Sequence, residues 1–126
     1  MNNVKNALMI AALIGSVNPV IAHDEANNST QKGVYQGTIH GSISDSMCKF
    51  DHSAMIKSGH GKDAASCAKK CISEGSKMVL ADKKDNTVYT FSNSKQAKSM
   101  VGKAVAVTGH IDPQTKVIHI HSIKAE

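Results

Sequence analysis

The sequence contains no tryptophan and no arginine, so all 15 of its basic residues are lysine, and its aromatic residues are only two tyrosines and two phenylalanines. Proteins that read nucleic acid rely on the paired hydrogen bonds of arginine and on aromatic surfaces that stack against bases. The formal net charge of +5 therefore does not indicate nucleic-acid binding. We interpret the lysines as residues that keep the chain soluble.

Motifs for hydrolysis and group transfer are also missing from the sequence. There is no G-x-S-x-G element, no glycine-rich loop of the kind that holds phosphate, and no evident pair of carboxylates. These absences predict a binding protein and not an enzyme.

No apolar run in the sequence reaches the ~20 residues that a membrane-spanning helix requires. The run at 7–17 follows Lys5 and is broken by Asn18 and Pro19. Small and aliphatic residues at 20–22 then form an A-x-A-like exit. This pattern is typical of a secretory signal peptide at 1–22. We expect cleavage after Ala22, a periplasmic or secreted location, and no stable membrane insertion.

The expected mature chain has 126 − 22 = 104 residues, which suits one domain. Residues 23–32 show no apolar periodicity and are predicted to be a flexible leader, followed by a single domain at 33–126. Alternating apolar residues and turn signals predict five strands, at 34–44, 77–82, 87–91, 103–111 and 116–124.

Two short helices are expected between these strands. Asp63 has the position of an N-cap for a helix that ends near Gly75, and Ser94 that of an N-cap for a second one that ends at Gly102. The fold class is therefore mainly β with short helices (α+β), and the order of elements matches a five-stranded barrel of the oligonucleotide/oligosaccharide-binding (OB) type. A cysteine-containing helical insert would lie between the first two strands. An open antiparallel α+β sheet is the alternative.

All three cysteines lie in one segment, 45–75, together with four other soft or borderline donors. The candidate metal ligands are Cys48, Cys67, Cys71, His52, Met55, Met47 and His60. Cys67 and Cys71 are four residues apart, so a helix places both thiols on one face. Thiolate and thioether donors select Cu(I), whereas thiolate with imidazole also suits Zn(II). The segment predicts a copper site first and a zinc site second, with the metal ion as the main partner and another periplasmic protein as a further one.

Histidines on the strands form a secondary set of candidates. His119 and His121 are two apart and point to one face of the last strand, while His110 and His40 occupy the polar faces of two others. Solvated histidines without a ligand are the alternative interpretation. His23 would be the first mature residue, and its amine and imidazole together suit Cu(II).

Two other roles for the cysteines stay open. In an oxidising compartment, Cys48 can form a disulfide with Cys67 or Cys71, which would stabilise the fold by about 3 kcal/mol and leave one thiol spare. The protein would then be a stapled interaction module. Thiol redox chemistry is the other alternative, because Lys69, Lys70 and a helix N-terminus can lower a thiol pKa.

Five short sequence motifs follow one another along the chain: G-x-I-S-D-S-x-C at 41–48, C-x-x-x-C at 67–71, G-S-K-x-V-L at 75–80, V-Y-x-F at 88–91 and G-K-x-V-x-V-T-G at 102–109. Together they resemble a family of small exported bacterial proteins classified as a domain of unknown function. The similarity spans 33–123. It implies export, a small β-rich domain and the cysteine trio as a family feature, and it implies no activity. The plan is also similar to that of small periplasmic copper carriers, although their aromatic cap has no tryptophan counterpart here.

Overall fold

The structure is a computed structural model, and it describes residues 33–126. The predicted signal peptide, its cleavage point after Ala22, the leader and His23 lie outside the described residues. Within 33–126, no helix combines the length and apolar character needed to cross a membrane.

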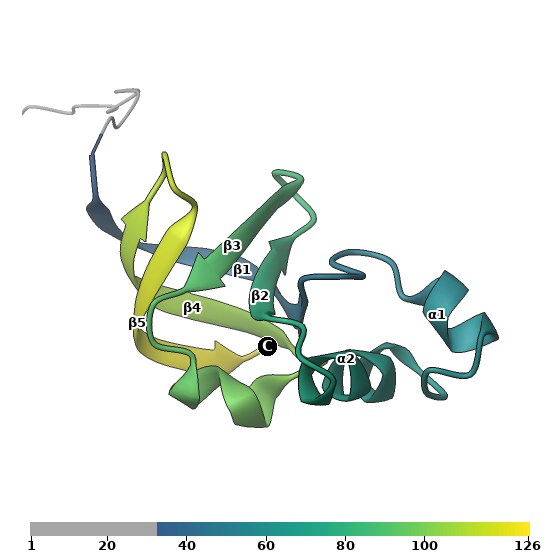
Figure 1. Ribbon diagram of the computed structural model, residues 1–126. Coiled ribbons are helices and arrows are strands. Elements are labelled where there is room, and N and C mark those ends of the chain that lie inside the picture. The colour runs from purple at the N-terminus through teal and green to yellow at the C-terminus, as the bar shows by residue number, and fades with distance from the viewer. Residues whose placement is uncertain (1–32) are drawn as a thin grey trace, which may run out of the picture.

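Five strands close into a barrel in the order β1-β2-β3-β5-β4, with two helices between β1 and β2 (Figure 1). This is the expected OB-type barrel with its helical insert, and the open sheet is wrong. The elements are β1 (Tyr35–Asp45), α1 (Ser53–Lys57), α2 (Ala64–Ser73), β2 (Met78–Asp82), β3 (Thr87–Phe91), η1 (Lys95–Met100, a 3₁₀ helix), β4 (Ala104–Asp112) and β5 (Val117–Ala125).

Strand β1 is long enough to serve two neighbours. Tyr35 to Ser42 pair with β4, and Ser42 to Asp45 pair with β2. The parallel pairing of β3 with β5, at Thr90 and Phe91, closes the barrel. Because β1 runs across the whole barrel, its last residues reach the side where α2 packs.

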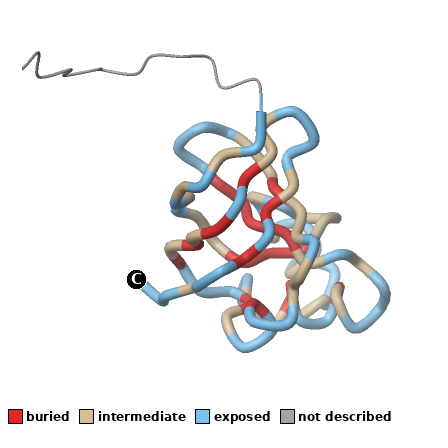
Figure 2. Tube along the Cα trace, turned by 90° about the vertical axis from the view of Figure 1, so that its left-hand side faces the viewer, coloured by how far each residue is buried: buried red, intermediate tan, exposed pale blue. Residues whose placement is uncertain are grey.

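Alternation in the strands produces the core. Apolar residues at every second position point inward, and Figure 2 shows the buried positions concentrated along the strands. The largest fully buried aliphatic side chains are Ile43, Leu80, Val79, Val105, Val107, Ile111, Ile118 and Ile120. The predicted inward face of the fourth strand is confirmed, since Val105, Val107, Gly109 and Ile111 are all buried.

Helix α2 begins as predicted. The Asp63 side chain accepts a hydrogen bond from the Ser66 backbone N–H, and the Ser66 hydroxyl oxygen accepts one from the Asp63 backbone N–H, which forms a capping box. Gly75 follows the helix with φ of 111°, a conformation that favours glycine. The helix buries Cys67, Ala68 and Cys71.

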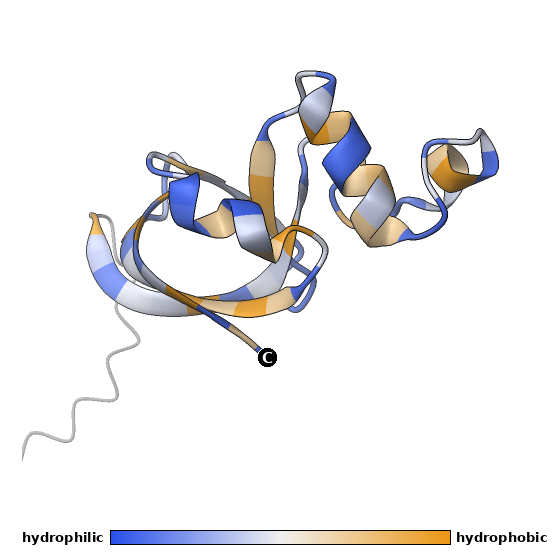
Figure 3. Ribbon diagram, turned by 90° about the horizontal axis from the view of Figure 1, so that it is seen from below, coloured by the Kyte–Doolittle hydropathy of each residue, from blue (hydrophilic) through white to orange (hydrophobic). Residues whose placement is uncertain are grey.

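Two local predictions need correction. The segment expected to be a helix capped by Ser94 is a 3₁₀ helix, and the Ser94 side chain makes no capping hydrogen bond. Helix α1 was not expected, because the segment that contains it has no apolar periodicity. It buries no residue, and Figure 3 shows it at the outer end of the insert, farther from the barrel than α2.

Gly102 sets the approach of α2 to the barrel. It has φ of 83°, and a Cβ at this position would collide with Ala65 in the first turn of α2. Gly102→Ala should therefore lower the free energy of unfolding by about 3 kcal/mol, through left-handed strain and overpacking. Urea denaturation measures the change. Gly33→Ala is the matched control, since its Cβ meets no atom within 4 Å, and equal effects of the two substitutions would contradict the prediction.

Candidate metal centre

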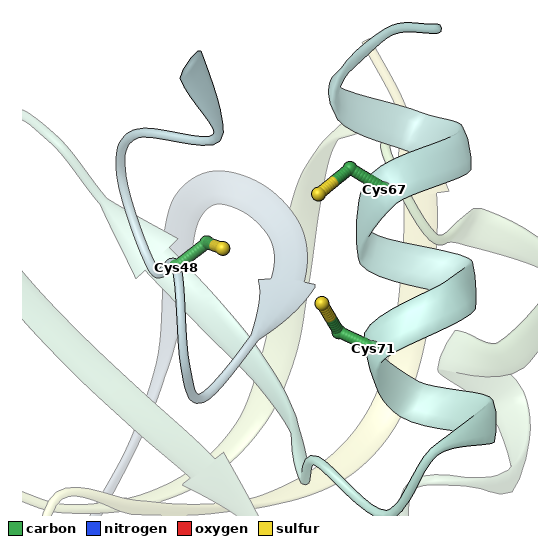
Figure 4. Close-up of side chains that lie close together, drawn as sticks. All are labelled: Cys48, Cys67 and Cys71. Atoms are coloured by element: carbon green, nitrogen blue, oxygen red, sulfur yellow. The ribbon is translucent and has the colours of Figure 1, made fainter. Parts of the chain in front are cut away.

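The thiols of Cys48, Cys67 and Cys71 meet between the loop after β1 and the face of α2. Their three sulfur atoms all lie within 4.8 Å of one another. Figure 4 shows the three side chains pointing into the same space. Cys67 and Cys71 are buried, Cys48 is half-buried, and all three are free thiols. The predicted meeting of sulfur atoms from two separate segments is therefore present in the fold.

The position of Cys48 is fixed by the last residue of β1. Asp45 is fully buried, and its Oδ1 accepts hydrogen bonds from the backbone N–H groups of Met47 at 3.0 Å and Cys48 at 2.9 Å. A further backbone bond runs from the Lys49 N–H to the Asp45 carbonyl oxygen at 2.9 Å. Lys49 itself has φ of 55°. These bonds close a tight turn that aims the Cys48 side chain at α2.

The second oxygen of the same carboxylate holds His52. Oδ2 of Asp45 lies 2.9 Å from His52 Nε2, and the Ser44 Oγ lies 3.2 Å from the same nitrogen. The Ser44 hydroxyl donates its hydrogen to the Lys49 carbonyl oxygen at 2.7 Å, so it can only accept from His52. Nε2 therefore carries the ring hydrogen. His52 can act as a metal ligand without losing these bonds only through Nδ1.

Asp45, Cys48 and His52 form a second donor group, because their ligand atoms also lie within 4.8 Å of one another. Cys48 belongs to both groups. The side chain of His52 is only 10% exposed and that of Asp45 is not exposed at all. The two groups together make one compact, mostly buried cluster of sulfur, nitrogen and oxygen atoms around Cys48.

The thiols of Cys48 and Cys71 are held in the protonated form, because the pKa of each is raised. Burial raises the pKa of Cys48 to about 12, and the negative charges of Asp45, Cys67 and Cys71 add to this effect. The pKa of Cys71 is raised by the same causes, burial first and Asp45 next. Lys69 and Lys70 were expected to lower a thiol pKa, but the pKa values of Cys48 and Cys71 are both raised. A protonated thiol is a poor nucleophile, which disfavours thiol exchange.

The other predicted donors of the insert lie less favourably. Met47 is 63% exposed. Met55 is half-buried on α1. The Nδ1 atom of His60 is buried without a hydrogen bond, 3.8 Å from Glu74 Oε2, and among the described residues His60 belongs to neither donor group. The structure thus brings the three cysteines together and places His52 beside Cys48, whereas His60 lies apart.

The secondary histidines separate into two places. The rings of His110 and His121 are 4.4 Å apart between centroids, and those of His119 and His121 are 5.9 Å apart. His40 does not share these ring contacts, and its Nδ1 lies 2.7 Å from Glu126 Oε1. The expected convergence therefore involves three of the four strand histidines.

Sequence reasoning missed Asp45 and Ser44 as parts of the centre. Ser44 was the last residue of the predicted first strand and Asp45 the first residue after it, where polar side chains are usually exposed. The available signal was their position within four residues of Cys48, where Asp and Ser side chains commonly bond to backbone N–H groups.

No protein-family model, curated protein or solved structure matches this chain. The resemblance to a family of small exported bacterial proteins stays a prediction.

The raised pKa of Cys48 has a direct consequence for its reactivity. At pH 8 the folded, metal-free protein should hold at least about a hundredfold less Cys48 thiolate than an ordinary cysteine. Alkylation by iodoacetamide, followed by intact mass, should accordingly be slow at pH 8 and accelerate toward pH 12. The same chain in urea is the control. A folded-state rate that levels off near pH 9 would refute the raised pKa of Cys48. Steric protection alone would slow alkylation at every pH but would leave the pH dependence of an ordinary cysteine.

Proposed function

We propose that this protein is a periplasmic or secreted metal-binding protein that holds one soft or borderline ion through Cys48, Cys67 and Cys71. Copper(I) is the first candidate and zinc(II) the second. One observation supports this proposal above the others: three free thiols, two of them buried, lie within 4.8 Å of one another. Sulfur atoms at such distances can move by a few tenths of an ångström to share one ion.

The number of sulfur atoms favours copper(I). Soft thiolates select Cu(I), whereas structural zinc sites are almost always four-coordinate. Zinc would therefore need a fourth ligand in addition to the three sulfurs, and the nearest candidates are the ring of His52 and the carboxylate of Asp45. Both are already engaged with each other at 2.9 Å.

The exposed side of the cysteine cluster offers a route by which an ion could enter from solvent or from another exported protein. Cys48 is half-buried while its neighbour Met47 is 63% exposed. A thioether at the surface, next to a thiol that reaches inward, gives a soft ion a first contact before it reaches the buried pair on α2. In this proposal Met47 is a transfer ligand and not part of the final site.

The same closeness of the sulfurs also suits the disulfide-stapled alternative. Cys48 could join either thiol of α2 in an oxidising compartment. An oxidised pair would leave one thiol and no trio of ligands. The two functions therefore predict different masses and different metal contents for the same protein.

The metal site is tested by titrating the reduced, metal-free protein with Cu(I) against a coloured chelator. One equivalent should bind tightly, and X-ray absorption should show sulfur scatterers alone. Zinc binding should instead show Zn–S distances of about 2.3 Å with one nitrogen or oxygen ligand. Cys48→Ser should abolish tight binding of either ion, because it removes the thiol that the loop contributes to the trio.

Met47→Ala is the matched control, since it changes the adjacent exposed residue and should slow Cu(I) uptake without changing the amount bound. Circular dichroism shows whether each variant remains folded. A tight equivalent retained by folded Cys48→Ser would refute the trio. So would native protein that is isolated two hydrogens lighter, without metal, from copper-loaded cells.

Export is tested on the same samples. We propose that the mature chain begins at His23, so the intact mass from the periplasmic fraction or the medium should correspond to residues 23–126. A full-length mass confined to the cytoplasm would contradict the proposed location.

A further inference from the structure

Three imidazoles meet on the outer surface of the β4–β5 hairpin, apart from the cysteine cluster. His110 pairs directly with His119 across the two strands. Both rings are exposed, and that of His121 contacts each of them edge-on, at 4.4 Å from His110 and 5.9 Å from His119. In Figure 1 this hairpin lies on the opposite side of the barrel from α2.

The backbone of the two strands causes this convergence. The register shifts between Thr108 and Gly109, so that His121 is the extra residue of a β-bulge. Bulges bend a strand and redirect its side chains. A Cβ on Gly109 would collide with the carbonyl oxygen of His119, so glycine is required for this close approach of the strands. The bulge and the glycine together crowd three rings onto one small area.

The ring of His119 is oriented by a neighbour. Its Nδ1 lies 2.9 Å from the hydroxyl oxygen of Ser92, in the segment after β3. A hydrogen bond at one ring nitrogen leaves the other, Nε2, free to bind a metal, which is the usual arrangement of histidine ligands. His110 and His119 also line a hollow of about 300 Å³, together with Asp112 and Ser92.

We propose that His110, His119 and His121 form a second metal site that takes a borderline divalent cation, Cu(II) or Zn(II). Imidazole nitrogen suits both ions. The ligand nitrogens of the three do not all lie within 4.8 Å of one another in the present rotamers. The rings are exposed, so rotation of His110 and His121 about their side-chain bonds would bring their nitrogens toward Nε2 of His119, which keeps its bond to Ser92. This site supplies nitrogen ligands only, in contrast to the sulfur ligands of the cysteine cluster.

Zinc titration of the reduced, full mature chain tests the site. Calorimetry should give a second, weaker equivalent after the cysteine cluster is filled, and ¹H–¹⁵N spectra of the histidine rings should shift for His110, His119 and His121. The double variant His110→Gln/His121→Gln should lose this equivalent and keep the first one. Cys48→Ser should do the reverse, so failure of either site is visible separately.

Two further variants sharpen the result. Ser92→Ala should weaken the second equivalent by about tenfold, as loss of a bond that orients a ligand does. His40→Gln should change nothing, because it removes an exposed histidine that the structure places against Glu126. The proposal is overturned if excess zinc leaves the three ring signals unshifted, or if the double variant binds both equivalents as the wild type does.

Discussion

The buried carboxylate of Asp45 is the constraint on which the centre depends. One of its oxygens accepts the backbone N–H groups of Met47 and Cys48, and the other holds His52 at 2.9 Å. A buried carboxylate is tolerated only when its oxygens are hydrogen-bonded in this way. Because Asp45 is also the last residue of β1, the barrel itself fixes where the Cys48 turn begins. The loop is therefore positioned by the sheet, even though its own sequence shows no periodic pattern.

Helix α2 supplies the other two thiols of the centre, and local sequence features of the helix position them. Its capping box starts the helix at Ala64, and four-residue spacing places Cys67 and Cys71 on the buried face. The close approach at Gly102 holds that face against the barrel. Contacts within the protein itself hold both halves of the centre in place. We infer that the cluster is assembled before any ion binds, which lowers the ordering cost of binding.

The predictable features of this protein were those that follow from local periodicity. Alternation along the strands, together with polar turn segments such as 83–86 and 112–115, placed the five strands to within about a residue. The Asp63 cap and the helical spacing of Cys67 and Cys71 were equally visible. The number and order of these elements matched an OB-type barrel, but an open antiparallel sheet remained an alternative until the structure showed the closure between β3 and β5.

The features that the sequence did not reveal depend on contacts between distant segments. Helix α1 buries no residue, so it has no apolar stripe to recognise. The burial of Asp45 depends on packing of the β1 end under the insert, and a single polar residue carries no sign of that. The meeting of His110 and His121 requires a bulge and a glycine in partner strands. The same limit explains why His40 was grouped with them, since face alternation alone does not give lateral position.

The charge of Asp45 acts on the cysteine cluster in two opposite ways. Without a cation it raises the cost of forming thiolates, and it is one cause of the raised pKa of Cys48 and of Cys71. With a cation in place, the same negative potential attracts the ion and favours the thiolates that bind it. Without a cation, the thiols of Cys48 and Cys71 are protonated and pack as small apolar groups. A bound cation would convert the ligands to thiolates. Because three thiolates and a carboxylate outweigh the charge of one ion, a divalent ion balances the centre better, while three sulfurs alone suit a monovalent copper ion better. The charge of the centre therefore favours a divalent ion, and its three sulfur ligands favour Cu(I). The number of ligands seen by X-ray absorption shows which of the two effects is larger.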